Sequence, residues 1–430
     1  MMRSLYSLFM WLVQPLLRLK LARRGEQEPG YLESMDERFG HYDQLASAAD
    51  GNTVWLHAVS LGETRAAMGL VAALRSRLPG MRLLLTHGTA TGRAEGQKLL
   101  QPGDLQCWQP WDTKATATRF IDHFQPRVGI LMETEIWPNL AAACAQARVP
   151  LVLVNARLSE KSLRWSQRLG WLARPAYRSL RSVWAQTQDD ATRLIAMGAP
   201  VQGVLGNLKF DAMPDTAQLA LGRSWHARAM RPVIMFASSR DGEEAALLQA
   251  LAAPNLAKAA SAVQWLLVPR HPQRFDEVAA LLVEQGFVVS RRSQWDDKSP
   301  PASGDKPTLW LGDTLGEMAL YYALADVALL GGSFEPLGGQ NLIEAAACAC
   351  PVVMGPHTFN FAEAAELACA AGAAQRVDNL QQAVLAASGL AQDAQGLIAA
   401  RQAAEAFAQA HRGALERTLA GILSSLQGAS

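Results

Sequence analysis

Acidic side chains follow two apolar, strand-like runs in the first half of the sequence. Glu63 comes after the run 54–58, and Glu133 and Glu135 come after the run 128–132. A carboxylate at a strand end can accept a proton in general-base catalysis, whereas a carboxylate that begins a helix can also serve only to satisfy the helix dipole. If the second strand continues, Glu133 and Glu135 point in opposite directions, and at most one is an acceptor-binding or supporting group. A carboxylate pair would also suit a glycoside hydrolase.

A glycine-rich stretch in the second half has the pattern of a phosphate site. The apolar run 327–330 is followed by Gly331, Gly332 and Ser333, and a helical pattern then begins near Asn341 and Glu344. Glycines allow backbone N–H groups to approach a ligand closely, and the first turn of a helix carries unpaired N–H donors. We therefore predict that these residues bind a nucleotide, with Glu344 accepting hydrogen bonds from ribose hydroxyls. The alternative is an ordinary strand–helix–strand crossover with glycines at its turns.

The elements that must position these residues alternate along the whole chain. Short apolar runs end in polar, glycine-bearing loops and are followed by helical patterns, which predicts doubly wound α/β sheets with their sites at the strand carboxyl ends. The series pauses near residue 206 and starts again at 232. We expect two Rossmann-like domains facing a cleft, an N-terminal acceptor domain over 25–205 and a C-terminal domain over 206–430 that binds the nucleotide.

Composition excludes several classes of protein. The 430 residues carry a net charge of only +1, which argues against nucleic acid as a partner. The five cysteines lack zinc-site spacing, so no metal site is predicted. The sequence contains no GxGxxG, P-loop or HExxH motif, which disfavours dehydrogenases, nucleotide triphosphatases and zinc proteases. A nucleotide-binding half joined to a carboxylate-rich half fits a two-domain glycosyltransferase.

The first 24 residues differ from the rest. They are strongly apolar and aromatic, are interrupted by Pro15, and end in a segment that contains the basic residues Arg18, Lys20, Arg23 and Arg24. The apolar stretch is shorter than the roughly 20 residues that span a bilayer. We expect residues 1–24 to form a membrane anchor helix that lies in the interface or inserts a short way, with its basic residues at anionic headgroups. The alternative is a helix docked on the protein itself.

Eight motifs occur in an order that resembles one family. They are HAVSLGE, METEIWPN, NARLSEKS, GNLKFD, PRHPQRF, GGSF, PLGG and MGPHTFNF. Together they closely resemble the Kdo transferases, which move 3-deoxy-D-manno-octulosonic acid (Kdo) from CMP-Kdo to a lipid A precursor. The resemblance extends over nearly the whole chain. It implies the GT-B fold, inversion at the anomeric carbon, catalysis without a metal or other cofactor, and attachment to the cytoplasmic face of the inner membrane in lipopolysaccharide biosynthesis.

The resemblance also gives roles to individual residues. It places the catalytic base at Glu63. Arg270 follows an apolar run, and its planar guanidinium matches either the CMP phosphate or the Kdo carboxylate. His271 either joins that donor site or only packs beside it. A basic, hydroxylated loop suits the phosphorylated glycolipid acceptor, although a solvated surface loop would have the same composition. The residues of that loop are Arg157, Lys161 and Ser162.

Two other functions remain open on the sequence. One is a GT-B transferase or epimerase that acts on a UDP-sugar. The other is a catalytically inactive membrane protein that binds glycolipid. The number of Kdo units transferred and the oligomeric state are also left open by the sequence.

Overall fold

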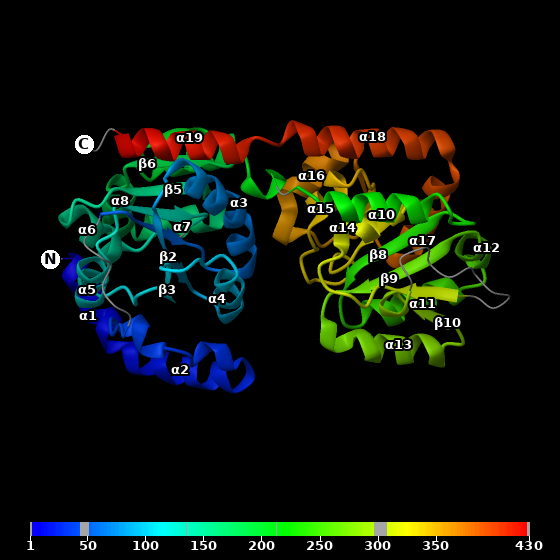
Figure 1. The fold of residues 1–430 in the computed structure, drawn as a ribbon, viewed down its shortest axis with the longest axis horizontal. Helices are drawn as coiled ribbons and strands as arrows, with labels where there is room; N and C mark the ends of the chain where they lie inside the picture. The colour runs from blue at the N-terminus through cyan, green and yellow to red at the C-terminus, as the bar shows by residue number, and fades with distance from the viewer. Residues whose placement is uncertain (1, 44–50, 135, 212, 296–307, 428–430) are drawn as a thin grey trace. The chain divides into compact units, whose positions relative to one another are not determined.

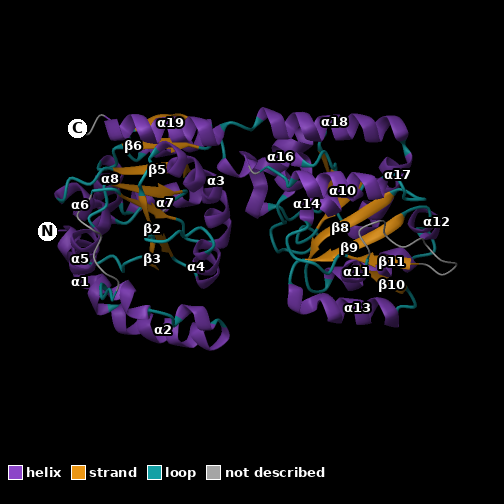
Figure 2. Cartoon of the chain, viewed as in Figure 1, coloured by secondary structure: helices purple, strands orange, loops and turns teal. Residues whose placement is uncertain are grey.

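The computed structural model describes residues 2–43, 51–134, 136–211, 213–295 and 308–427. The chain forms two compact units (Figure 1). The first comprises Met1–Asp211 and Arg412–Ser430, and the second comprises Ala212–His411. Each unit contains a seven-stranded sheet in which neighbouring strands run parallel, with helices packed around it (Figure 2).

The first unit has the strand order β3-β2-β1-β4-β5-β6-β7. The chain moves outward from β1 to β3 and then returns to the other side of β1 with β4. Loops after β1 and β4 therefore leave the sheet in opposite directions, which is where ligands bind in sheets of this kind. The strands are β1 Thr53–His57, β2 Arg82–His87, β3 Leu105–Trp108, β4 Val128–Met132, β5 Leu151–Ala156, β6 Ser182–Ala185 and β7 Val201–Val204. The helices are α1 Met2–Leu12, α2 Gln14–Gln27, α3 Leu61–Arg77, α4 Ala90–Gln97, α5 Lys114–Phe124, α6 Pro138–Gln146, α7 Glu160–Arg168, α8 Gly170–Arg178, α9 Gln188–Ala196 and α19 Ala414–Gln427.

The second unit repeats this arrangement with the order β10-β11-β9-β8-β12-β13-β14. Here the reversal lies between β8 and β12, so the loops after those two strands flank the expected ligand site. The strands are β8 Val233–Ser239, β9 Gln264–Pro269, β10 Val288–Arg291, β11 Thr308–Leu311, β12 Val327–Leu330, β13 Val352–Met354 and β14 Ala374–Arg376. The helices are α10 Thr216–His226, α11 Glu243–Ala252, α12 Ala257–Ser261, α13 Phe275–Glu284, α14 Met318–Leu324, α15 Leu342–Ala347, α16 Ala362–Ala370, α17 Leu380–Gln392 and α18 Ala394–Ala410.

Both faces of the first sheet are buried, which explains why its strands are apolar runs rather than alternating patterns. Trp55 of β1 packs into a cluster with helix residues such as Phe120 of α5. Its neighbours Val54 and Leu56 point the other way and join a second cluster that includes Ile422 of α19. The sheet is thus the middle layer of a three-layer unit.

The last helix returns to the first unit, which differs from the predicted domain over 206–430. Helix α19 packs against α3 and β5, and its apolar side chains belong to the core of the first unit. The carboxylate of Asp211 accepts hydrogen bonds from the backbone N–H groups of Gly413 and Leu415 at the start of α19. The first unit therefore contains both the segment from residue 206 to Asp211 and the chain's last helix.

The N-terminal segment forms two helices instead of one anchor helix. They are separated at Val13, and Pro15 lies in the first turn of α2, where a missing N–H costs little. In the part of the chain that the structure describes, no helix has the length and apolar character needed to cross a bilayer.

Candidate active site

Glu63 lies in the first turn of α3, directly after β1. Ser60 is the N-cap: its hydroxyl oxygen accepts from the Glu63 N–H at 3.4 Å and donates to Glu63 Oε1 at 3.0 Å. The Val59 N–H donates to Glu63 Oε2 at 2.9 Å. This variant of a capping box fixes the half-buried carboxylate at the carboxyl end of the sheet. The helix-capping and catalytic interpretations of Glu63 are therefore compatible.

Glu133 directly follows β4, which is the neighbour of β1 in the sheet. Its Oε1 is 3.0 Å from Lys209 Nζ, and both side chains are largely buried. Glu133 has a φ of 57°, so the extended conformation ends at Met132. The prediction that Glu133 and Glu135 point in opposite directions required the strand to continue, but the strand ends before Glu133. Glu135 lies outside the described residues.

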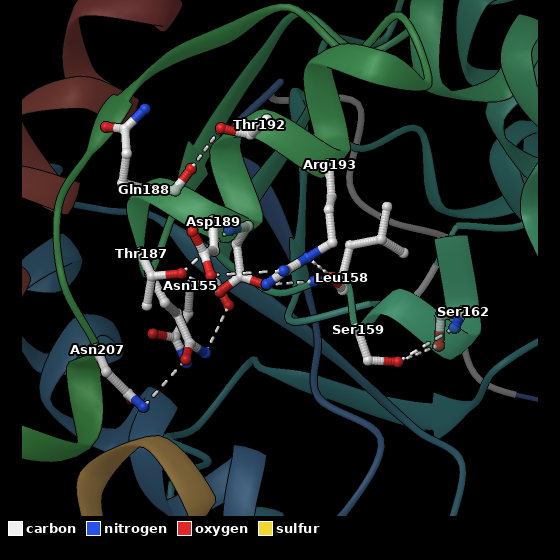
Figure 3. A network of polar contacts seen from close by, with 12 residues as sticks. Asn155, Leu158, Ser159, Ser162, Thr187, Gln188, Asp189, Thr192, Arg193 and Asn207 are labelled. Carbon is white, nitrogen blue, oxygen red and sulfur yellow. Dashed lines mark hydrogen bonds and ion pairs between the residues drawn. The ribbon is translucent and has the colours of Figure 1, made fainter. Parts of the chain in front are cut away.

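A buried amide network brings Lys209 to this position. Asn155 Oδ1 accepts from the Leu208 N–H at 3.0 Å, and the Asn155 carbonyl accepts from Gln186 Nε2 at 2.9 Å. Asn207 Nδ2 in turn donates to Gln186 Oε1 at 3.1 Å (Figure 3). The ends of β5 and β6 are thereby tied to the segment after β7. Sequence reasoning missed Lys209, because its partner Glu133 lies 76 positions away.

The predicted acceptor loop is anchored at its middle. The Leu158 N–H donates to Asp190 Oδ1 at 2.8 Å, and its carbonyl accepts from Arg193. Ser162 is engaged in capping α7, since its N–H donates to the Ser159 hydroxyl at 3.1 Å (Figure 3). Arg157 and Lys161 are exposed, and neither belongs to an ion pair in the described part of the chain. The two cations, rather than Ser162, remain placed to meet an anionic acceptor.

In the second unit, Glu243 joins the two loops that flank the strand-order reversal. Its carboxylate accepts from the Gly332 N–H at 2.7 and 2.9 Å and from the Arg240 N–H at 2.9 Å. The side chain is fully buried, and this burial raises the pKa of Glu243, opposed by the same hydrogen bonds. A Cβ on Gly331 would lie 2.3 Å from the Ser238 carbonyl oxygen, so only glycine fits there. The glycine-rich loop is therefore held rigidly beside the loop after β8.

This geometry makes Glu243 a positioning residue. Glu243→Ala is expected to raise KM for the predicted sugar-nucleotide donor about 10-fold while changing kcat less, because the unpaired N–H groups of Arg240, Gly332 and Phe334 would each cost about 1–3 kcal/mol and displace the loop. Steady-state kinetics with varied donor would measure this split. Glu277→Ala is the control, since Glu277 is exposed and only pairs with Arg274 at 3.4 Å. An unchanged donor KM in Glu243→Ala would contradict the assignment.

Other predicted donor residues have different environments. Ser333 is fully buried; its hydroxyl donates to the Leu330 carbonyl and accepts from the Gly355 N–H at 2.8 Å, so its side chain serves the fold. Asn341 is the N-cap of the short helix α15, where its Oδ1 accepts from the Ile343 N–H at 3.1 Å. Glu344 is half-buried in the first turn of the same helix. The Ser333 side chain is thus engaged in the fold, and the N–H groups of Gly331, Gly339 and Gln340 donate to carbonyl groups of the protein itself.

Arginines gather at the carboxyl ends of β8 and β9. The Arg270 N–H donates to the Ser239 carbonyl at 2.9 Å, and His271 follows it. Burial lowers the pKa of His271, and the charges of Arg240, Arg270 and Arg274 lower it further. His271 is therefore neutral near pH 7, within a positive field suited to an anion.

Arg274 is the main residue of this region that sequence reasoning missed. Its Nη1 donates to both carboxylate oxygens of Glu244, at 3.0 and 3.1 Å, and Glu244 is fully buried. The Ser239 hydroxyl donates to the same carboxylate at 2.7 Å. The only sign of a role for Arg274 in the sequence was its position within the motif 269–275. No spacing rule pairs Arg274 with Glu244, which lies 30 positions away.

Potential metal ligands do not cluster in the described ranges. No group of three or more His, Cys, Asp or Glu side chains there could hold a metal ion.

The fold and these loops define a class of protein. The chain is similar in structure to the UDP-GlcNAc 2-epimerase from Neisseria meningitidis, with a TM-score of 0.56 and 15% identity, covering 87% of this chain and 100% of that one. It is also similar to a glycosyltransferase from Rickettsia africae, with a TM-score of 0.54 and 12% identity, covering 88% and 99%. At these identities the likeness shows the fold alone, which is the two-domain GT-B fold of glycosyltransferases.

The sequence comparisons are more specific. A family model described as 3-deoxy-D-manno-octulosonic-acid transferase matches residues 33–212. The chain is 46% identical to the 3-deoxy-D-manno-octulosonic acid transferase of Bordetella pertussis over 97% of this chain and 98% of that protein. It is 32% identical to the Haemophilus influenzae protein of the same name over 84% of each. The chain belongs to the Kdo transferase family.

Proposed function

We propose that this protein transfers Kdo from CMP-Kdo to the lipid A precursor lipid IVA with inversion at the anomeric carbon. The observation that carries the proposal is the full-length relation to the Bordetella pertussis transferase. The positions of Glu63 and of the arginines near Arg270, each at the carboxyl end of a parallel sheet, support it. The reaction belongs to lipopolysaccharide biosynthesis.

In the proposed reaction, Glu63 accepts the proton of a glucosamine hydroxyl on the acceptor. The hydroxyl oxygen forms a bond to the anomeric carbon of Kdo while the bond from that carbon to the CMP phosphate oxygen breaks. Arg270 stabilises the negative charge that develops on the leaving phosphate. A single displacement inverts the anomeric centre, and no covalent sugar–enzyme intermediate forms.

Donor choice tests this function against the UDP-sugar alternative. A similar fold occurs in an epimerase bound to UDP-GlcNAc, so nucleotide binding alone is not diagnostic. CMP is expected to raise the melting temperature of the protein and to compete with the donor, whereas UDP at the same concentration is expected to do neither. Calorimetric titration with both nucleotides measures the difference. Tighter binding of UDP than of CMP would contradict the proposal.

We further propose that α1 binds the protein to the cytoplasmic face of the inner membrane. One face of α1 is docked on the first unit: Tyr6 hydrogen-bonds Asp112, the Ser7 hydroxyl accepts from the Lys114 N–H at 2.8 Å, and the Met10 carbonyl accepts from Trp111 Nε1 at 2.9 Å. The opposite face carries apolar side chains at positions 5, 8, 9 and 12, which are 52–60% exposed. Such a face suits the membrane interface.

Replacing Leu8, Phe9 and Leu12 together with serine is expected to weaken binding to phosphatidylcholine vesicles by about 100-fold or more. Full burial of such a side chain contributes about 1.5–3 kcal/mol, and only about half of each one is exposed and can be newly buried in the bilayer. Cosedimentation measures the partition coefficient. A triple serine variant at exposed apolar positions of other helices is the control. Its positions are Met68, Ile195 and Ile398. Equal binding by both variants would remove α1 from this role.

A further inference from the structure

A second amphipathic surface lies on α7 and α8, on the sides of these helices that face solvent. Helix α7 buries none of its residues. Lys161, Arg164, Trp165 and Arg168 are exposed and have the spacing i, i+3, i+4, i+7, which places them on one helix face. Only partly buried side chains such as Leu163 contact the core. Helix α7 therefore presents a cationic and aromatic stripe.

Helix α8 repeats this pattern. Trp171, Arg174, Pro175 and Arg178 have the same spacing and are also exposed, whereas Ala176 and Tyr177 on the other side are buried. The two tryptophans at positions 165 and 171 are 58% and 45% exposed. Two consecutive helices thus place tryptophan and arginine side chains toward solvent. Packing of the core does not require this arrangement, so it indicates a binding surface.

Charge identifies the kind of partner. Residues 160–178 contain five cations and one carboxylate, a local charge of +4 in a chain whose net charge is +1. In the described residues, none of these five cations takes part in an ion pair, and the Arg168 guanidinium instead lies 5.6 Å from the Trp165 ring. Interfacial tryptophans beside cations are typical of surfaces that bind anionic lipid headgroups.

The surface is continuous with the helix already assigned to the membrane. Helix α1 packs against α8 and α6, and α7 packs against α8. A groove of about 340 Å³ lies among α1, α6 and α8, and Arg3 and Trp171 both line it. The apolar face of α1 and the exposed face of α8 are therefore neighbours within the first unit.

We propose that α7 and α8 form a second membrane-contact surface, in which their arginines bind anionic headgroups and Trp165 and Trp171 enter the interface of an anionic bilayer. Contact through α1 is apolar, so it depends little on lipid charge. Contact through α7 and α8 is electrostatic, so it requires anionic lipid and weakens as salt is raised. The surface begins next to the predicted acceptor loop and would hold that loop near the bilayer.

The test compares binding of the full chain to vesicles of phosphatidylcholine and of phosphatidylcholine with phosphatidylglycerol at 3:1. Replacing Arg164, Arg168 and Arg174 with glutamine is expected to lower binding to the anionic vesicles about 100-fold, at about 1 kcal/mol per cation, and to leave binding to neutral vesicles unchanged. The control variant removes three exposed cations from other elements and has the same net charge. Its changes are Arg77→Gln, Arg127→Gln and Lys258→Gln.

Transferase activity is measured in parallel with detergent-dispersed acceptor. Selective loss of anionic-vesicle binding, with unchanged detergent activity, supports the proposal. Unchanged vesicle binding, or an equal loss in the control variant, overturns it. A parallel loss of detergent activity also overturns it, because the arginines would then act on the acceptor or on the fold. Trp165→Ser with Trp171→Ser is expected to reduce quenching of the protein's fluorescence by brominated lipid in anionic vesicles, and unchanged quenching would contradict insertion.

Discussion

Replacing Glu63 with glutamine is expected to lower kcat by about 10²–10⁴-fold, because the amide cannot accept the proton of the attacking hydroxyl. The glutamine side chain would keep an oxygen able to accept the Val59 N–H, which the wild-type carboxylate accepts at 2.9 Å. The start of α3 should therefore survive, and donor KM should change little. Steady-state kinetics with CMP-Kdo and acceptor measure both constants.

The control for Glu63 is Ser60→Ala, which is expected to lose at least as much stability as Glu63→Gln. This change removes the hydroxyl that caps α3 and contacts Glu63 Oε1 at 3.0 Å, at a cost of about 1 kcal/mol of stability. It leaves the carboxylate in place, so its loss of kcat is expected to be far smaller than that of Glu63→Gln. If Glu63→Gln retained near wild-type turnover, or if both variants lost activity equally, the base would have to be sought elsewhere.

Replacing Arg274 with alanine is expected to destabilise the second unit by about 3–5 kcal/mol, the largest effect on stability that we predict. The change would take away the cation that pairs with the fully buried Glu244 carboxylate, and the hydrogen bond from the Ser239 hydroxyl would not replace that charge. For a unit of this size, the loss corresponds to a fall in melting temperature of about 10 °C. Scanning calorimetry of the full chain measures the shift.

A second variant separates charge from packing. Combining Arg274→Met with Glu244→Gln removes both charges and keeps much of the side-chain volume, so it is expected to recover a large part of the lost stability. Arg376→Ala provides a control at an ion pair whose carboxylate, on Glu366, is 73% exposed, and it is expected to have a much smaller effect. A melting temperature in Arg274→Ala equal to that of wild type would contradict a structural role for the buried pair.

The sequence predicted the sheets well because both sheets are parallel and buried. The run 128–132 is continuously apolar, the run 54–58 is apolar except for the buried His57, and the structure places β4 and β1 there. The glycine-rich turn after residue 330 was also predictable, since Gly332, Gly338 and Gly339 all have positive φ values that favour glycine. These signals are local, and a local pattern is what a single sequence reports.

The rest depended on contacts between distant residues. The sequence could not show that Ser333 is bonded to Gly355, that Arg274 pairs with Glu244, or that Glu133 pairs with Lys209. The same applies to α19: its apolar stripe predicts that the helix is buried but not which unit buries it. A single sequence thus proposes candidate side chains, whereas tertiary contacts decide which of them serve the fold.

The measurement that tests the central claim most directly is mass spectrometry of the product. The purified protein is incubated with CMP-Kdo and tetraacylated lipid A precursor, with and without EDTA. We predict that the lipid gains the mass of a whole number of Kdo residues, that the gain survives chelation, and that CMP is released in equal amount. The number of residues gained gives the count of sugars transferred. Unchanged lipid in the presence of folded protein and intact donor would contradict the account.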